Sequence, residues 1–242
     1  MEMFNKNPSA LPAHLPPIWT PLYIHRNSLY FFLKKEIPQI MRECSKLRHK
    51  DKISVLDVGC GTMPYLHLFI ENENCECYEG ADIEKIRGVS VLVDPVTQTI
   101  QADDESYDLV VHFQALEHVS NPKKFINECW RVLRPNGVMF CTVPFIFEYH
   151  AVPRDFYRWT YEGLHQDLEN CGFDVLEIKG IESDWESVLT ILQLFISRQF
   201  GYFFTKPLFF LLNLLSFLPT NKKYNLLPLT NAASAVKRPK VL

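Results

Sequence analysis

A glycine turn directly after a short apolar run constrains the fold of this chain more than any other feature. The run is Ile53-Ser54-Val55-Leu56, and the turn that follows it is Asp57-Val58-Gly59-Cys60-Gly61. Glycines at such a turn let the backbone approach a ligand closely beyond the carboxyl end of a strand. The segment therefore predicts a buried parallel strand that ends in a ligand-binding turn.

Further apolar runs alternate with helical segments along the chain. Strands are predicted at residues 77–81, 109–113, 138–143 and 173–179, with a last strand at 232–236. A helix is predicted over residues 27–48, and Asn121-Pro122 and Thr160 predict two more helix starts, the second helix closing at Gly172. This alternation predicts an α/β fold with a doubly wound, mostly parallel sheet.

The turn also restricts the cofactor. A dinucleotide fingerprint would continue with a small residue where Pro64 stands, and here an acidic residue, Asp57, already precedes the glycines. A nicotinamide or flavin cofactor is therefore disfavoured. A cofactor with an amino-acid tail and a ribose suits the turn better, because Asp57 can lie near an ammonium and Asp82, after the next strand, near ribose hydroxyls.

At this point the chain resembles a known family. Residues 55–61 are similar to the first motif of class I S-adenosylmethionine-dependent methyltransferases. Glu117-His118-Val119 and Arg131-Val132-Leu133-Arg134-Pro135-Asn136-Gly137 resemble the pattern of the type 11 members, and the resemblance covers residues 53–180. It implies a Rossmann-like sheet of seven strands with the last strand antiparallel, S-adenosylmethionine as cofactor and methyl transfer as the activity.

The resemblance also implies a donor site. Gly59 and Gly61 would approach the methionine moiety, Asp82 the ribose and Asp94 the adenine, while Gln114 would line the edge after the fourth strand. The residues expected to bind the cofactor are Asp57, Gly59, Cys60, Gly61, Asp82, Ile83, Asp94 and Gln114. The segment between Asp82 and Asp94 is too short for the full helix and strand found in many members.

The acceptor side is less defined, because methyl transfer from a sulfonium can proceed without a catalytic base. If the acceptor is a hydroxyl, the candidate catalytic residues follow the fourth and fifth strands: His118, His150, Asp155 and Arg158. Alternatively, Arg158 pairs with Asp155 to hold a loop, and His118 bonds only to nearby backbone. Glu117 is interpreted as a helix cap or a contact on the cofactor side.

An apolar insertion precedes the last strand. Polar residues recur at helical spacing on an otherwise apolar segment, at Thr190, Gln193, Ser197, Gly201 and Thr205, and predict one helix over 188–205 with a narrow polar stripe. Arg198 and Lys206 interrupt any run long enough to span a membrane. Residues 184–220 could instead form a helical hairpin that lies on a membrane surface, a lid over an apolar acceptor or a homodimer interface. Lys222, Lys223, Lys237, Arg238 and Lys240 favour an anionic surface.

Composition bounds the remaining possibilities. The net charge of −3 argues against a nucleic-acid partner, and seven cysteines without paired knuckles predict reduced thiols and no metal site. The proline-rich start lacks the apolar core of a secretory signal, so we expect a cytoplasmic protein, with or without peripheral contact with a membrane.

The chain divides into an N-terminal arm and helix (1–48), a cofactor-binding core (49–182), the apolar helical insertion (183–228) and a last strand with a basic tail (229–242). The predicted function is methyl transfer to a small or lipid-linked acceptor, such as a precursor of a surface glycan or lipid. The alternative is a noncatalytic adaptor that keeps the fold and binds a partner or membrane through the insertion.

Overall fold

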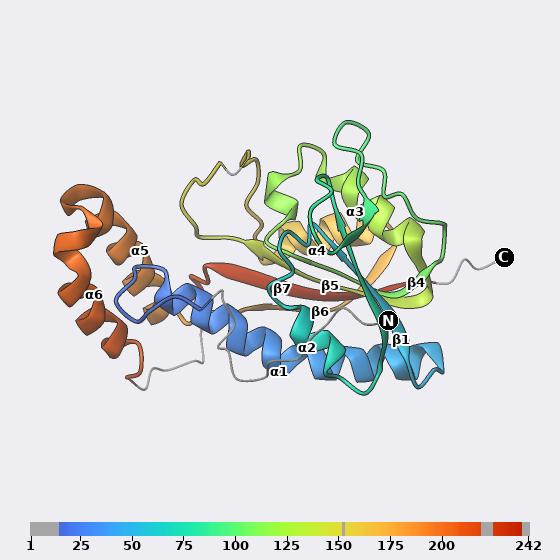
Figure 1. The fold of residues 1–242 in the computed structure, drawn as a ribbon, viewed down its shortest axis with the longest axis horizontal. Helices are drawn as coiled ribbons and strands as arrows, with labels where there is room; N and C mark the ends of the chain where they lie inside the picture. The colour runs from blue at the N-terminus through green and yellow to red at the C-terminus, as the bar shows by residue number, and fades with distance from the viewer. Residues whose placement is uncertain (1–14, 152, 219–224, 239–242) are drawn as a thin grey trace.

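The protein is built around one seven-stranded sheet, in the strand order β3-β2-β1-β4-β5-β7-β6 (Figure 1). The computed structural model describes residues 15–151, 153–218 and 225–238. Its strands are β1 (Ile53–Val58), β2 (Cys75–Asp82), β3 (Val89–Leu92), β4 (Tyr107–Phe113), β5 (Leu133–Pro144), β6 (Phe173–Gly180) and β7 (Thr230–Lys237). Only the pairs that β7 makes with β5 and β6 are antiparallel. The predicted doubly wound, mostly parallel sheet with an antiparallel last strand is confirmed.

Helices cover both faces of this sheet. They are α1 (Tyr23–Arg48), α2 (Leu66–Ile70), α3 (Pro122–Val132), α4 (Tyr161–Asn170), α5 (Asp184–Phe200) and α6 (Tyr202–Leu215), with a short 3-10 turn, η1 (Leu116–His118). In Figure 1, α1 and α2 lie on one side of the sheet and α3 and α4 on the other. No helix separates β2 from β3, as the short spacing between Asp82 and Asp94 predicts, but this segment does contain a strand, the four-residue β3.

The core has two halves because side chains along a strand point alternately to the two faces of the sheet. Every residue of β1 is buried, and all of β4 except Phe113. Leu56 and Val110 pack with Phe125 of α3 and Leu164 of α4 on one face. On the other face, Val55 and Val111 pack with apolar side chains of α1 and α2, among them Leu33, Ile37, Met41 and Phe69.

The ends of two helices follow the predicted signals. The Asn121 side chain accepts a hydrogen bond from the Lys124 amide at the start of α3, and Thr160 accepts one from the Gly163 amide at the start of α4. After α4, Gly172 has a φ of 88°, where glycine is favoured. By contrast, α1 begins at Tyr23 rather than near residue 27, because Ile24 and His25 are buried in contacts that local sequence does not reveal.

The insertion corrects one prediction. The single helix expected over residues 188–205 is two helices, because Gly201 has a φ of 75° and separates α5 from α6. Ser183 and Glu186 form a capping box that fixes the start of α5. None of the described helices is both long enough and apolar enough to cross a membrane.

Candidate methyl-donor and acceptor site

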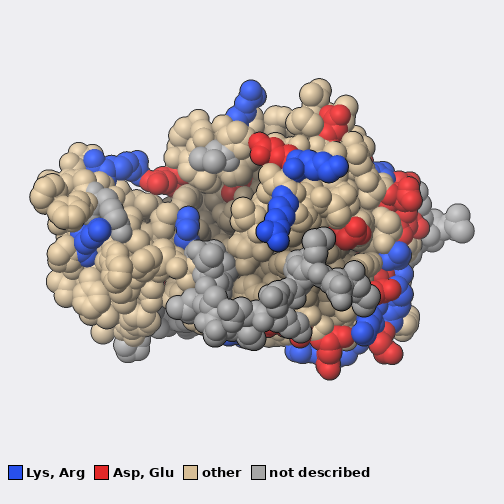
Figure 2. All heavy atoms as spheres, in the orientation of Figure 1, with Lys and Arg blue, Asp and Glu red and all other residues tan. Residues whose placement is uncertain are grey.

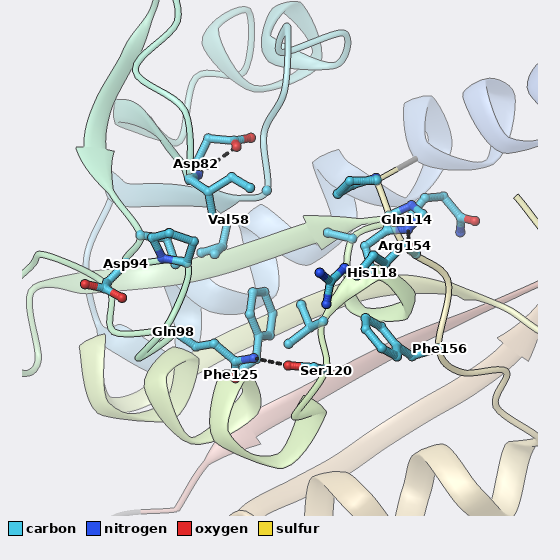
Figure 3. A pocket seen from close by; sticks show the side chains of 17 residues that line it. Val58, Asp82, Asp94, Gln98, Gln114, His118, Ser120, Phe125, Arg154 and Phe156 are labelled. Atoms are coloured by element: carbon cyan, nitrogen blue, oxygen red, sulfur yellow. Dashed lines mark hydrogen bonds between the residues drawn. The ribbon is translucent and has the colours of Figure 1, made fainter. Parts of the chain in front are cut away.

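A cavity of about 520 Å³ lies beyond the carboxyl ends of β1, β2 and β4 (Figure 3). Six residues named by the sequence line it: Gly59, Asp82, Ile83, Asp94, Gln114 and His118. The other lining residues were not named as cofactor-binding or catalytic candidates: Val58, Val93, Pro95, Gln98, Ala115, Val119, Ser120, Phe125, Pro153, Arg154 and Phe156. Cavities of roughly 300–1,000 Å³ are typical of small-molecule sites.

The glycine turn shapes one wall of this cavity. Gly59 has a φ of 74°, and a Cβ on it would lie 2.7 Å from the Cβ of Ala115. The amide of Gly61 donates a 2.9 Å hydrogen bond to Asp82 Oδ2, and the amide of Ile83 donates to Asp82 Oδ1 at 2.7 Å. Asp82 therefore holds the turn against the end of β2 while its carboxylate faces the cavity, where ribose hydroxyls could donate to it.

The far wall fits a flat aromatic base. Val93, Pro95 and Phe125 supply an apolar surface beside Asp94. The Asp94 carboxylate already accepts hydrogen bonds from the amides of Val96 and Thr97, which lower its pKa and form the turn of its own loop. Asp94 thus shapes this wall of the cavity through its own loop, at the position where the resemblance places the adenine.

Three predicted cofactor residues do not line the cavity. The Asp57 side chain is buried, and the Tyr78 hydroxyl donates a hydrogen bond to it; burial raises the pKa of Asp57 to about 7. Cys60 is buried beside Gly80, and Gly61 acts through its amide. These residues shape the turn from behind the cavity wall.

The acceptor-side candidates form two groups. Asp155 and Arg158 hold each other through two hydrogen bonds of 2.5 and 2.7 Å, and this pairing lowers the pKa of Asp155 to about 2. Arg158 also donates to the carbonyl oxygens of Phe147 and Glu148. This is the loop-holding arrangement considered from the sequence.

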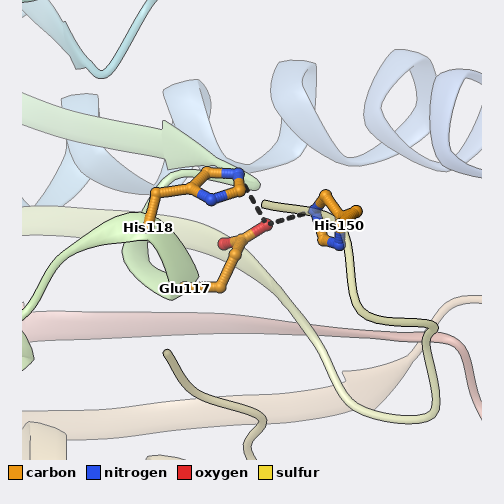
Figure 4. Close-up of side chains that lie close together, drawn as sticks. All are labelled: Glu117, His118 and His150. Atoms are coloured by element: carbon orange, nitrogen blue, oxygen red, sulfur yellow. Dashed lines mark ion pairs between the residues drawn. The ribbon is translucent and has the colours of Figure 1, made fainter. Parts of the chain in front are cut away.

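The second group is a Glu–His cluster formed by Glu117, His118 and His150 (Figure 4). Glu117 is fully buried in η1, and its Oε1 lies 3.8 Å from His118 Nε2 and 3.9 Å from His150 Nε2. Burial raises the pKa of Glu117 to about 7 and lowers that of His150. His118 connects this cluster to the donor cavity because it lines the cavity wall.

The comparisons with known proteins agree with this geometry. The model of a methyltransferase domain family matches residues 31–178, more than half of the chain. The chain therefore belongs to the methyltransferase domain family, which confirms the predicted family, the class I fold and S-adenosylmethionine as the cofactor.

Among curated relatives, a ubiquinone biosynthesis O-methyltransferase of Maricaulis maris is 33% identical over 106 residues, which are 37% of this chain and 39% of that protein. The chain thus spans about two fifths of the length of this relative. The comparisons give no support to a noncatalytic adaptor.

Solved structures share the fold. The cyclase SpnF superposes with a TM-score of 0.53 at 20% identity, over 83% of this chain and 80% of that one. A phosphoethanolamine N-methyltransferase 2 of Haemonchus contortus, in complex with S-adenosyl-L-methionine, has a TM-score of 0.52 at 15% identity, over 98% and 62% of the two chains. At these identities the likeness shows the fold alone.

Proposed function

We propose that this protein transfers the methyl group of S-adenosylmethionine to a hydroxyl oxygen of a lipid-linked acceptor at a membrane surface. The cofactor supplies a methyl group activated by its sulfonium. The acceptor oxygen must lose its proton, which calls for a basic group beside the donor cavity. The Glu–His cluster is the observation that supports a hydroxyl acceptor, since it gathers one carboxylate and two imidazoles, and one of them, His118, lines the cavity.

Two further points favour oxygen as the acceptor atom. The name of the Maricaulis maris relative describes an O-methyltransferase of ubiquinone biosynthesis. In this chain, burial raises the pKa of Glu117 to about 7, which is nearer the operating range of a proton acceptor than an ordinary carboxylate is. We assign the binding and deprotonation of the hydroxyl to the cluster as a unit.

The polarity of α5 and α6 supports a membrane location. Their polar side chains point inward: Ser187, Thr190, Gln193, Thr205 and Asn213 are all buried, and Gln193 donates a 2.9 Å hydrogen bond to Asn213. Large apolar side chains of the two helices are exposed instead, among them Phe195, Phe200, Phe203, Phe204 and Leu211, and so are Phe217 and Leu218 just after α6. This is the reverse of a water-facing helix pair and suits helices that meet lipid.

The position of this helical pair suits delivery of an acceptor from a membrane. Figures 1 and 2 show α5 and α6 at one end of the long axis, with a surface that carries few charges. An ion pair between Arg198 of α5 and Glu148 ties the pair to the loop that carries His150. The surface that would meet lipid is thus joined to the segment that carries the acceptor-side residues.

A labelled-methyl assay tests the reaction. The full chain, methyl-labelled S-adenosylmethionine and a lipid extract of the native host should give a labelled, organic-extractable ether. Glu117→Gln should lower the rate at least about a hundredfold, because a base contributes at least that much, while affinity for S-adenosylhomocysteine is kept. His165→Gln, on the exposed surface of α4, is the matched control. A nitrogen- or carbon-methylated product, or an unchanged rate in Glu117→Gln, would contradict the proposal.

Vesicle flotation tests the membrane location. The full chain should float with vesicles, and replacing Phe200, Phe203 and Phe204 by Ser should abolish flotation, because these side chains are 66%, 75% and 82% exposed. Ile70→Ser, an exposed apolar residue of α2, is the control. If flotation persists in the triple variant, the membrane role fails. A dimer that the triple substitution dissociates, without flotation, would favour the homodimer instead.

A further inference from the structure

Three hydrogen-bond acceptors converge at the Glu–His cluster. His118 Nδ1 bonds to the carbonyl oxygen of Arg154, which can only accept, so Nδ1 carries the ring proton and Nε2 presents a lone pair. His150 Nδ1 likewise lies 3.2 Å from the carbonyl oxygen of Glu148 and 3.4 Å from Asp155 Oδ2. Both Nε2 atoms therefore carry a lone pair, and they lie 3.8 and 3.9 Å from Glu117 Oε1, with the two rings beside the carboxylate in Figure 4.

No donor in the described part of the chain hydrogen-bonds to either oxygen of the fully buried Glu117 carboxylate. The distances of 3.8 and 3.9 Å to the two imidazoles are too long for hydrogen bonds. Arg158, a nearby cation, is bonded to Asp155 and to main-chain carbonyls. A buried carboxylate beside two unprotonated imidazole nitrogens is unfavourable unless a proton or a metal cation lies among them, and only a metal cation can contact all three groups at once.

We propose that Glu117 Oε1, His118 Nε2 and His150 Nε2 bind one divalent transition-metal ion, of which zinc is the representative. The three ligand atoms lie within 4.8 Å of one another. Metal–ligand distances of about 2.0–2.2 Å in a tetrahedral site place ligand atoms about 3.4 Å apart. Each imidazole therefore needs to approach Glu117 Oε1 by about 0.5 Å, and the widest pair of ligand atoms needs to close by up to about 1.4 Å. Two imidazoles and one carboxylate favour zinc or its neighbours over magnesium or calcium.

The surroundings have the features of a metal site. Metal-binding histidines usually donate their second ring N–H to a carbonyl or carboxylate, and both histidines here do so. With three protein ligands the ion keeps an open position, as catalytic zinc sites do. This inference rests on the proposed function only for its role: an acceptor hydroxyl at the open position would lose its proton more readily, and Glu117 Oε2, which does not bind the metal, would accept that proton. The binding itself depends on the cluster alone.

Calorimetric titration of the metal-stripped full chain with zinc chloride tests the binding. We expect one ion per chain, with affinity lowered at least about tenfold in both Glu117→Gln and His150→Ala. His165→Gln and Cys77→Ser are matched controls, because zinc could otherwise bind the exposed His165 or Cys77. Retained affinity for S-adenosylhomocysteine shows that each variant is folded.

Cobalt substitution supplies an independent readout, since visible bands without thiolate charge-transfer bands indicate nitrogen and oxygen ligands. The proposal is overturned if 100 µM zinc does not bind, if both cluster variants bind it like the wild type, or if cobalt shows thiolate ligation. Metal binding without any methyl transfer would leave the site standing and remove the proposed reaction. Methyl transfer that needs Glu117 but no metal would support the proposed reaction and overturn the metal site.

Discussion

Gly59 has a backbone conformation that favours glycine, and it also lines the donor cavity. A Cβ at this position would meet Ala115 at 2.7 Å, whereas one at Gly61 would find no atom within 4 Å, and both residues have positive φ. We expect Gly59→Ala to lower affinity for S-adenosylhomocysteine at least about tenfold, and Gly61→Ala to cost only the backbone strain of about 1–2 kcal/mol in stability. Isothermal calorimetry and denaturant unfolding measure both. Equal effects on binding would contradict this account of the turn.

Asp57 gives a pH dependence with a definite sign. Burial raises its pKa from 3.8 to about 7, so the folded protein binds a proton that the unfolded chain has released in this window. The resulting stabilisation is fully present below pH 4 and is lost as pH rises to about 7, by at most about 1.4 kcal/mol per pH unit. In Asp57→Asn this loss disappears, so the variant should gain stability relative to the wild type between pH 5 and 8. If urea unfolding shows the same pH dependence of stability for the wild type and Asp57→Asn, this account of Asp57 is wrong.

At the same scale, the sequence predicts some site residues and not others. Gly59, Asp82 and Gln114 were predictable because each follows a strand whose carboxyl end lies at the ligand edge. The burial of Glu117 between two histidines was not predictable, because His150 lies 33 positions further along the chain and approaches Glu117 through a loop after β5. The sequence predicts that β4 and β5 are neighbours. It does not predict that the side chains of Glu117, His118 and His150 come together.

At the scale of elements, Asp108 joins four segments. Its fully buried carboxylate accepts hydrogen bonds from Arg48 at the end of α1 and Ser54 of β1, and it pairs with Lys50 and with Arg134 of β5. Burial acts to raise the pKa of Asp108, but these amide and cationic partners outweigh it and hold the pKa at about 2.

We therefore expect Asp108→Ala to lower the free energy of unfolding by about 3 kcal/mol, because it leaves the buried Ser54 donors and the partly exposed Arg48 and Arg134 without a partner. Asp103→Ala, in an exposed loop, should change it by less than about 0.5 kcal/mol. Urea unfolding at pH 7 compares the two. Losses of similar size would show that the Asp108 network does not hold these elements together.

Element boundaries were predictable where a local signal sets them. Asn121, Thr160 and Gly172 mark helix ends through their own hydrogen bonds or φ angles, and they lie as the sequence indicated. The start of α1 was not predictable, since it depends on a 2.7 Å contact between His25 and the distant Glu182. The polar stripe of the insertion continues at helical spacing through Gly201, so the break there was hidden by the pattern itself.

At the scale of the whole molecule, two surfaces of different chemistry stand apart. The donor cavity opens at the carboxyl edge of the sheet, while the outward apolar faces of α5 and α6 form one end of the molecule. Both features are predictable from the sequence. The role of the insertion, as a membrane contact, a lid or a dimer interface, is not, because periodicity alone does not tell which stripe of a helix faces inward. The division of the chain into four parts remains a prediction.

Calorimetric titration of the full chain with S-adenosylhomocysteine tests the central claim most directly. We predict one molecule bound per chain, with a dissociation constant on the order of 10 µM, about −7 kcal/mol. Asp82→Ala should weaken binding at least about tenfold, because Asp82 both faces the cavity and holds the Gly61 amide. No detectable binding by the wild type, or equal binding by wild type and Asp82→Ala, would contradict the donor site described here.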